Sequence, residues 1–268
     1  MSRRFETLSL EVADGIATLT LDRPDRRNAV NKAMNRELPL AWAAIEADPA
    51  VRAVIVTGAG DKAFCTGADL ADQPIPNDPE LARSIRSISW TGRQNGCTKP
   101  FIAAVNGMTV GGGIHFIADA DIVIASDQAR LIDTHVAVGF VAGLEPVSLV
   151  HRMPLGAVMK LALTGGDERL DAAEAHRLGL FDEVLPAAQV MPRCRALAAN
   201  IARHSPTAVA RSRAAIWNAL EQPLSQALEE AWRLIMRQND HPDASEGVQA
   251  FLDKRAPVWQ ERTPGDLA

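Results

Sequence analysis

The residues best suited to chemistry lie between positions 99 and 126. Three consecutive glycines, Gly111 to Gly113, follow an apolar run from Phe101 to Val105 and the turn signal Asn106-Gly107. This order predicts a strand, a glycine-lined turn and the start of a helix. Each glycine costs a helix about 1 kcal/mol relative to alanine, so helix stability does not explain the triplet. Because peptide N–H groups at a helix start lack intrahelical partners, they can bind a negative oxygen, and we predict an anion or oxyanion site here.

Two histidines lie near this turn in the sequence. His115 follows the glycine triplet, and His135 lies in the segment Ile132-Asp133-Thr134-His135-Val136. Imidazole titrates near neutral pH, so either side chain could take a proton from water or from a substrate carbon. We expect His115 in the first turn of a helix, whose dipole would keep it neutral and basic. Asp133 or Glu145 could orient an imidazole, and the alternative is that both histidines are hydrogen-bonded core residues.

A metal site is a further alternative for the same residues. His115 and Asp119 would share one helical face, and Asp133 and His135 are two residues apart. The spacing matches none of the tight zinc signatures, so we expect no metal.

A second glycine-rich stretch follows the apolar run Ala53 to Val56, which predicts a buried strand. Its residues 58–63 have the order Gly-x-Gly-x-x-Ala, which mimics a dinucleotide-binding fingerprint. That motif must open a long helix, whereas this turn runs into Phe64-Cys65-Thr66-Gly67 and a proline-rich loop. We therefore do not expect nicotinamide binding.

The elements that would position these residues alternate between strand and helix. Asp14-Gly15 predicts the turn of an opening hairpin, and Asn31 predicts the cap of a helix that Pro39 should kink. Further strands are expected over 53–56, 101–105, 121–125 and 129–132. This order favours an α/β core. Prolines within 71–79 predict a mobile surface loop.

The second half of the chain becomes purely helical after residue 190. Before that point, a helix with Leu81, Ile85 and Ile88 on one face is expected, and Asp171 predicts the cap of another. Near the end, Asp243 with Glu246 three residues on predicts a capping box. We therefore expect an α/β core over residues 1–190 and a helical region over 191–268.

The composition restricts the class of protein. With 268 residues, 47% apolar and 23% charged, the chain has the balance of a soluble globular protein. A net charge of -5 argues against nucleic acid as a partner. The three cysteines form neither a disulfide framework nor a CxxC pattern, which suits a reducing cytosol. No apolar run follows Arg3 and Arg4, so no signal peptide is expected. No segment reaches the length of a membrane span, which is about 18 apolar residues, so we expect a cytoplasmic protein without a membrane partner.

The two glycine-rich stretches and their spacing resemble the crotonase family, that of enoyl-CoA hydratases and isomerases. The resemblance extends through residues 21–30, 163–180 and 246–255, in the family's order. It implies a core of stacked β-β-α turns in a spiral, followed by a helical region that packs into homotrimers or hexamers formed as dimers of trimers. In that family two backbone N–H groups hold the thioester oxygen of an acyl-CoA, and the resemblance maps them to Ala68 and Gly112. Such an oxyanion hole stabilises an enolate-like intermediate.

The resemblance also implies that coenzyme A enters as part of the substrate, with no permanently bound cofactor. It places the adenine near Ala68, Asp69 and Leu70, with main-chain contacts around Arg27 and Ala29. Basic side chains form charge-assisted hydrogen bonds to phosphates, and those suited to this role are Arg26, Arg27 and Lys62, although surface solubility explains each equally well. Phe251 and Lys254 match residues that, in the family, meet the coenzyme of a neighbouring subunit.

The sequence departs from the family at the catalytic acids. Hydratases of the family carry a glutamate just after the glycine triplet and another about twenty residues later, and the matching residues here are His115 and His135. We therefore expect an enoyl-CoA hydratase or isomerase-like enzyme with these histidines as the acid/base pair. Retro-Claisen hydrolysis of a β-dicarbonyl compound by a histidine-activated water is an alternative. A catalytically silent acyl-CoA-binding homologue is another.

Overall fold

The structure is a computed structural model that describes residues 2–76 and 78–263. Its main sheet has the strand order β1-β2-β3-β4-β6-β8-β11. The strands are β1 (Ser2–Arg4), β2 (Leu8–Ala13), β3 (Ile16–Leu21), β4 (Ala53–Gly58), β6 (Phe101–Val105), β8 (Ile122–Ser126) and β11 (Glu183–Leu185). β1 to β3 are antiparallel, as the hairpin signal predicts, and every pair from β3 to β11 is parallel. The edge strand β1 was not predicted.

A second, smaller sheet lies beside the main one in the order β10-β9-β7-β5. Its strands are β5 (Ala63–Cys65), β7 (Met108–Val110), β9 (Arg130–Ile132) and β10 (Leu170–Asp171). The chain therefore adds one strand to the main sheet and one to the smaller sheet in each of three successive turns, from β4 and β5 to β8 and β9. This is the expected α/β spiral of stacked turns.

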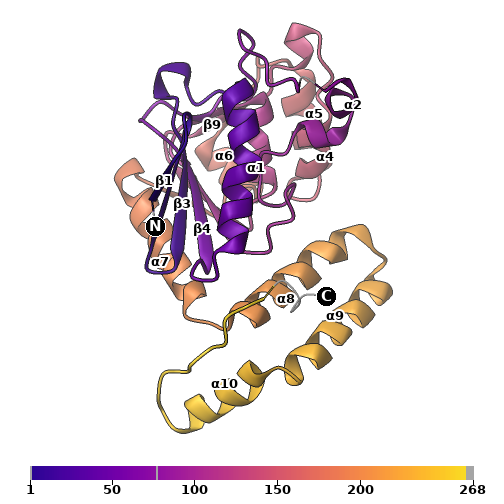
Figure 1. The fold of residues 1–268 in the computed structure, drawn as a ribbon. Coiled ribbons are helices and arrows are strands. Elements are labelled where there is room, and N and C mark those ends of the chain that lie inside the picture. Colours follow the sequence, from indigo (N-terminus) through magenta and orange to yellow (C-terminus); the bar gives the residue numbers. More distant parts are fainter. Residues whose placement is uncertain (1, 77, 264–268) are drawn as a thin grey trace.

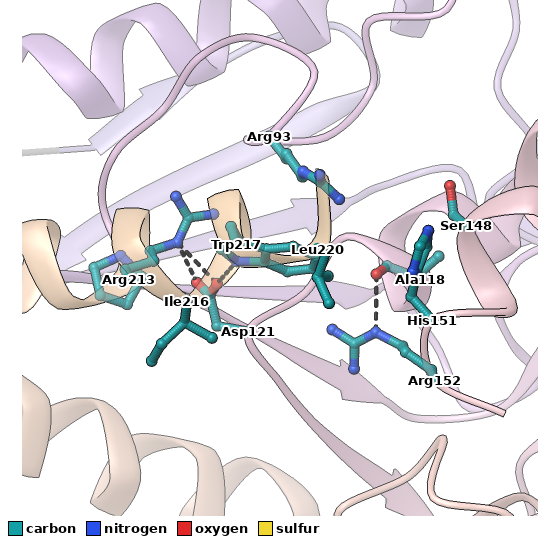
Figure 2. A pocket seen from close by; sticks show the side chains of 11 residues that line it. Arg93, Ala118, Asp121, Ser148, His151, Arg152, Arg213, Ile216, Trp217 and Leu220 are labelled. Atoms are coloured by element: carbon teal, nitrogen blue, oxygen red, sulfur yellow. Dashed lines mark hydrogen bonds and ion pairs between the residues drawn. The ribbon is translucent and has the colours of Figure 1, made fainter. Parts of the chain in front are cut away.

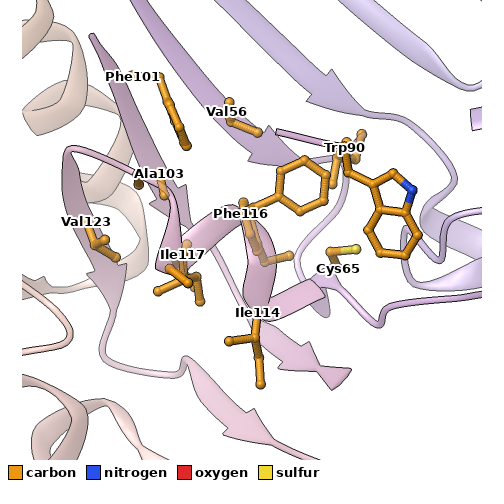
Figure 3. Close-up of a cluster of buried hydrophobic side chains, with 14 of the residues drawn as sticks. Val56, Cys65, Trp90, Phe101, Ala103, Ile114, Phe116, Ile117 and Val123 are labelled. Carbon is orange, nitrogen blue, oxygen red and sulfur yellow. The ribbon is translucent and has the colours of Figure 1, made fainter. Parts of the chain in front are cut away.

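The central strands β4, β6 and β8 of the main sheet are mostly apolar and buried, because helices and loops cover both of their faces. Val54 and Val56 of β4 face the larger core cluster with α1, whereas Ala53 and Ile55 face α7. Figure 3 shows the larger cluster around Phe101 and extending to residues beside the glycine turn. The main core therefore supports the glycine-rich segments directly.

Helix α1 (Lys32–Ala47) begins as predicted, because the Asn31 side chain accepts a hydrogen bond from the Met34 N–H at 3.0 Å. The helix continues through Pro39. Asp171 likewise caps α6 (Ala172–Arg177) by accepting from the Glu174 N–H at 2.9 Å. The described helices include none that is long and apolar enough to cross a membrane.

Two predictions about helices are wrong. The expected helix through Leu81, Ile85 and Ile88 is broken into α2 (Pro79–Ala82) and the 3₁₀ helix η2 (Ile85–Ser87), and Ile85 is 71% exposed. Leu81 and Ile85 are exposed, whereas Ile88 packs against the larger core cluster, so the three side chains form no continuous buried face that would stabilise one helix. Asp243 does not form the capping box, because His241 caps α10 (Pro242–Leu252) while Asp243 is buried and accepts from the Gln260 N–H.

The helical region forms an arm that extends from the core. Figure 1 shows α8 (Pro206–Asn218), α9 (Leu224–Asn239) and α10 beyond the sheets. The preceding helix α7 (Ala187–Ala202) packs on the main sheet through Val190, Cys194 and Ala198. The expected division at residue 190 therefore falls inside a helix that belongs to the core by its contacts.

Candidate active site

The two glycine-rich segments meet at distances that exclude side chains. A Cβ atom on Gly67 would lie 2.8 Å from the Gly112 nitrogen, and Gly67 has a left-handed φ of +76°. A Cβ atom on Gly113 would lie 2.3 Å from the Cys65 carbonyl oxygen. Glycine is therefore required by close backbone approach at both positions. The structure brings together the segments that the sequence singles out.

The backbone around Ala68 is held by a parallel bridge to Val30. The Val30 N–H donates to Gly67 O at 2.7 Å, and the Asp69 N–H donates to Val30 O at 2.8 Å. This pattern turns the Ala68 N–H away from Val30. Gly112 lies in the first turn of the 3₁₀ helix η3 (Gly111–Ile114), where N–H groups lack intrahelical acceptors.

Two histidines and a glutamate converge beside this glycine turn. His115 begins the one-turn helix α3 (His115–Ala118), His135 precedes the 3₁₀ helix η4 (Val136–Val138), and Glu145 lies on α4 (Leu144–Leu149). Glu145 Oε1 is 3.2 Å from His115 Nε2 and 3.9 Å from His135 Nε2. His115 and Glu145 are buried. The structure therefore places one carboxylate between the two imidazoles that the sequence singles out.

His135 is oriented by Asp133. Its ring Nδ1 lies 2.8 Å from Asp133 Oδ1, which also accepts from the His135 backbone N–H at 3.0 Å. This hydrogen bond raises the pKa of His135, against the opposing effect of burial. A Cβ atom on Gly111 would lie 3.3 Å from His135 Cε1, so the ring stands next to the glycine turn. The side chain of His135 is 23% exposed, the most accessible of the cluster.

Glu145 is anionic at neutral pH although it is buried. Burial raises its pKa, but the close contact with His115 and the charge of His135 are among the causes that lower the pKa by more. Among the described residues, no cluster of three or more His, Cys, Asp or Glu side chains is placed to hold a metal ion.

The surroundings of His115 differ from the expectation. Helix α3 has only four residues, so the dipole that was expected to act on His115 is that of one turn. Gln94 Nε2 instead lies 3.3 Å from His115 Nδ1, and the Trp90 ring packs edge-on against the imidazole with centroids 5.9 Å apart. Gln94 and Trp90 were not predicted as site residues because they lie in a segment with no motif.

The segments expected to bind coenzyme A are tied together by two side chains. Asn28 donates to Ala59 O and Ala63 O, each at 2.9 Å. Arg23 Nη1 donates to Ala29 O at 2.6 Å and to Asp69 Oδ2 at 3.0 Å. Five of the residues expected to contact the coenzyme are exposed on these joined segments, and they are Arg26, Arg27, Lys62, Ala68 and Leu70.

The remaining two expected coenzyme contacts lie elsewhere in the chain. Phe251 is on α10 and is 83% exposed, and Lys254 follows it. Figure 1 shows α10 at the far side of the arm, away from the core loops. One chain alone therefore does not bring Phe251 and Lys254 to the other coenzyme-binding candidates.

A separate pocket of about 390 Å³ lies between the core and α8. Figure 2 shows the Asp121 carboxylate in this pocket joined to Arg213 and Trp217, and it accepts from Arg213 Nε at 2.7 Å and from Trp217 Nε1 at 2.6 Å. Asp121 also accepts from the Phe101 N–H at 2.8 Å. None of the site residues expected from the sequence lines this pocket.

The α/β spiral carries a glycine-lined backbone site beside two histidines and a glutamate, which is the arrangement of an enzyme, and comparison with known proteins identifies its family. The model of the enoyl-CoA hydratase/isomerase family matches residues 11–262. The chain therefore belongs to the enoyl-CoA hydratase/isomerase family, within the crotonase superfamily, and is an enzyme of the hydratase-like type.

Individual relatives agree over almost the full length. The chain is 34% identical to (E)-benzylidenesuccinyl-CoA hydratase of Thauera aromatica over 254 residues, covering 94% of this chain and 98% of the relative. It is 33% identical to mevalonyl-coenzyme A hydratase of Aspergillus fumigatus over 255 residues, covering 91% of each. The crystal structure of an enoyl-CoA hydratase/isomerase from Mycobacterium paratuberculosis superposes with a TM-score of 0.88 at 37% identity, covering 97% of this chain and 100% of that one.

Proposed function

We propose that this enzyme adds water to a 2-enoyl-CoA thioester, with the Ala68 and Gly112 N–H groups holding the thioester oxygen. The contact between Gly67 and the Gly112 nitrogen supports this proposal, because it sets the two backbone segments side by side. Polarising the carbonyl makes the β-carbon electrophilic and stabilises the enolate that forms when water adds. Loss of one such donor typically costs about 3 kcal/mol of barrier.

The histidine and glutamate cluster would then move the protons. His135 Nδ1 is engaged by Asp133, which leaves Nε2 free to take a proton from the attacking water. The oxygen bonds to the β-carbon, the electron pair of the double bond moves into the thioester enolate, and the α-carbon then accepts a proton from the cluster. Glu145, between His135 and His115, stabilises the positive charge that His135 acquires.

Steady-state hydration of a short and a medium 2-enoyl-CoA tests this function. His135→Ala should lower kcat by about 100-fold or more, because general base catalysis contributes on that scale, and His115→Ala should impair turnover too. The exposed His204 lies outside the cluster, so His204→Ala is the matched control and should keep wild-type rates. Wild-type protein that binds acyl-CoA tightly but hydrates neither substrate would refute hydration and favour a silent binding homologue.

The Asp133 and His135 pair also supports the second candidate, retro-Claisen hydrolysis of a β-dicarbonyl compound. In that reaction His135 would take a proton from water, the oxygen would bond to one carbonyl carbon, and the bond to the central carbon would break to release an enolate that is then protonated. This reaction does not require coenzyme A. Turnover of a diketone without the coenzyme, with no enoyl-CoA hydration, would establish it.

The proposal includes a cytoplasmic homotrimer, or a hexamer built from two trimers, in which a neighbour supplies Phe251 and Lys254 to the coenzyme site. An exposed apolar stripe along α9 supports assembly, because a monomer would leave it in water. Its members follow helical spacing and are Leu224, Leu228, Trp232 and Ile235. Light scattering coupled to size exclusion distinguishes a trimer, a hexamer and a monomer.

A further inference from the structure

The orientation of the Gln94 amide is fixed by backbone donors. Its Oε1 accepts from the Trp90 N–H at 2.8 Å and from the Thr91 N–H at 3.1 Å. A peptide N–H can only donate, so the end of the amide that faces these two groups must be the oxygen. The NH₂ end is thereby turned towards His115 Nδ1, at 3.3 Å.

This contact determines where His115 carries its proton. The NH₂ group of Gln94 only donates, so His115 Nδ1 must accept, and the proton of the neutral imidazole must be on Nε2. His115 Nε2 lies 3.2 Å from Glu145 Oε1. This close contact does not meet hydrogen-bond geometry, and Nε2 has no other hydrogen-bond partner within the described residues. Rotating the ring by half a turn would place carbon atoms against both Gln94 and Glu145.

The turn that carries Gln94 is anchored on both sides. Thr91 Oγ1 donates to Asp119 Oδ2 of the segment after α3 at 2.6 Å and accepts from the Gln94 N–H at 3.2 Å. Trp42 Nε1 of α1 donates to Trp90 O at 2.8 Å. The Gln94 amide therefore has little freedom to turn over or withdraw from His115.

We propose that Gln94 is a positioning residue that holds His115 in the Nε2–H tautomer. His115 then directs its Nε2–H towards Glu145, and the imidazole that accepts the proton from water is His135. Asp133 selects the opposite tautomer of His135, with the proton on Nδ1. Glu145 from α4 is the charged group that the structure places next to His115 Nε2, at 3.2 Å, and it also lies 3.9 Å from His135 Nε2. The division of labour between the histidines rests on the proposed function, whereas the tautomer does not.

Magic-angle-spinning ¹⁵N spectra of histidine-labelled protein test the tautomer, with the His115 signals assigned by difference from His115→Asn. Wild type should show a protonated Nε2 and an unprotonated Nδ1. Gln94→Glu keeps an oxygen for the Trp90 and Thr91 N–H groups but presents a carboxylate to Nδ1, so a proton should appear on Nδ1. Gln189 is exposed on α7, so Gln189→Glu is the matched control and should leave the spectrum unchanged.

Steady-state hydration kinetics of the same variants test the effect of the tautomer on catalysis. Gln94→Glu should lower kcat by about tenfold or more while KM for the acyl-CoA changes little, since the amide is turned towards His115 rather than towards the coenzyme loops. A wild-type His115 protonated on Nδ1, or signals that Gln94→Glu leaves unchanged, would overturn the proposal. A wild-type Nε2–H tautomer in an enzyme that hydrates no enoyl-CoA would instead uphold the role of Gln94 and refute the proposed function.

Discussion

Alanine at Gly112 is the sharpest perturbation of the proposed oxyanion hole. Its Cβ would lie 2.7 Å from Trp90 Cζ3, whereas unstrained carbon atoms sit about 3.5–4.0 Å apart. Trp90 cannot easily yield, because it is buried and its Nε1 donates to Asn35 Oδ1 at 2.6 Å. The strain must therefore move the turn by about 0.5–1 Å. A displacement of about 1 Å at a reacting centre can cost about 100-fold in rate, so kcat/KM should fall by about that factor.

The same overpacking should lower the free energy of unfolding by about 1–3 kcal/mol. Gly156 on α5 (Leu155–Leu163) is the matched control, because nothing lies within 4 Å of the Cβ that alanine would add there. Gly156→Ala should keep wild-type activity and leave stability equal or higher, because alanine favours the helix. The variants are compared by enoyl-CoA hydration and by urea unfolding.

A Gly112→Ala enzyme that keeps its activity to within about threefold would refute the assignment of the Gly112 N–H to the oxyanion hole, since a lost donor costs about 10²–10³-fold. Trp90→Phe tests whether the loss of activity comes from the clash with Trp90 rather than from a general loss of stability, because it removes the ring atom that the new Cβ would meet. If the clash is responsible, alanine at Gly112 should cost less stability in that background.

Three further predictions concern charge and burial. Asp133→Asn should lower the pKa of His135, so the acid limb of the kcat/KM profile should move to lower pH. The raised pKa of His135 stabilises the folded protein fully only below about pH 6.5, and this stabilisation is lost as pH rises through the folded-state pKa. Urea titrations should therefore show a larger destabilisation of the variant in acid than in alkali. All three cysteines are buried with their pKa raised to about 12 by burial, so a thiol reagent should label them slowly until the protein unfolds, and fast labelling of native protein would contradict their placement. Arg23→Met should raise KM for acyl-CoA more than it lowers kcat, because Arg23 joins the two proposed coenzyme-binding segments at Ala29 and Asp69. An equal KM in the wild type and the variant would argue against a coenzyme site on these segments.

Local signals explain what could be predicted from the sequence. Asn31 could be identified as a cap because its partner is the N–H of a residue three positions away. The two glycine turns were found because a close backbone approach demands glycine, wherever the approaching segment comes from. The central strands β4, β6 and β8 could be predicted because they are covered on both faces and are therefore mostly apolar.

What could not be predicted depends on contacts distant in sequence. Glu145 is a candidate orienting acid from the sequence, but its position between His115 and His135 depends on how α4 packs against the glycine turn, which no local pattern encodes. Gln94 meets His115 across 21 residues from a turn without a motif. The continuous helix expected around Ile85 is wrong for the opposite reason, since the apolar spacing is present but Leu81 and Ile85 remain exposed.

One carboxylate couples the arm to the strand that enters the glycine turn. Asp121 accepts from Arg213 and Trp217 of α8 and from the first N–H of β6, so it fastens the arm and the start of that strand at a single point. In the proposed trimer, a shift of the arm at a subunit contact would thus displace the start of β6, the strand that leads to the proposed oxyanion hole. Asp121→Ala releases both attachments together, so if the proposed trimer forms through the arm, assembly and turnover should both fall in that variant.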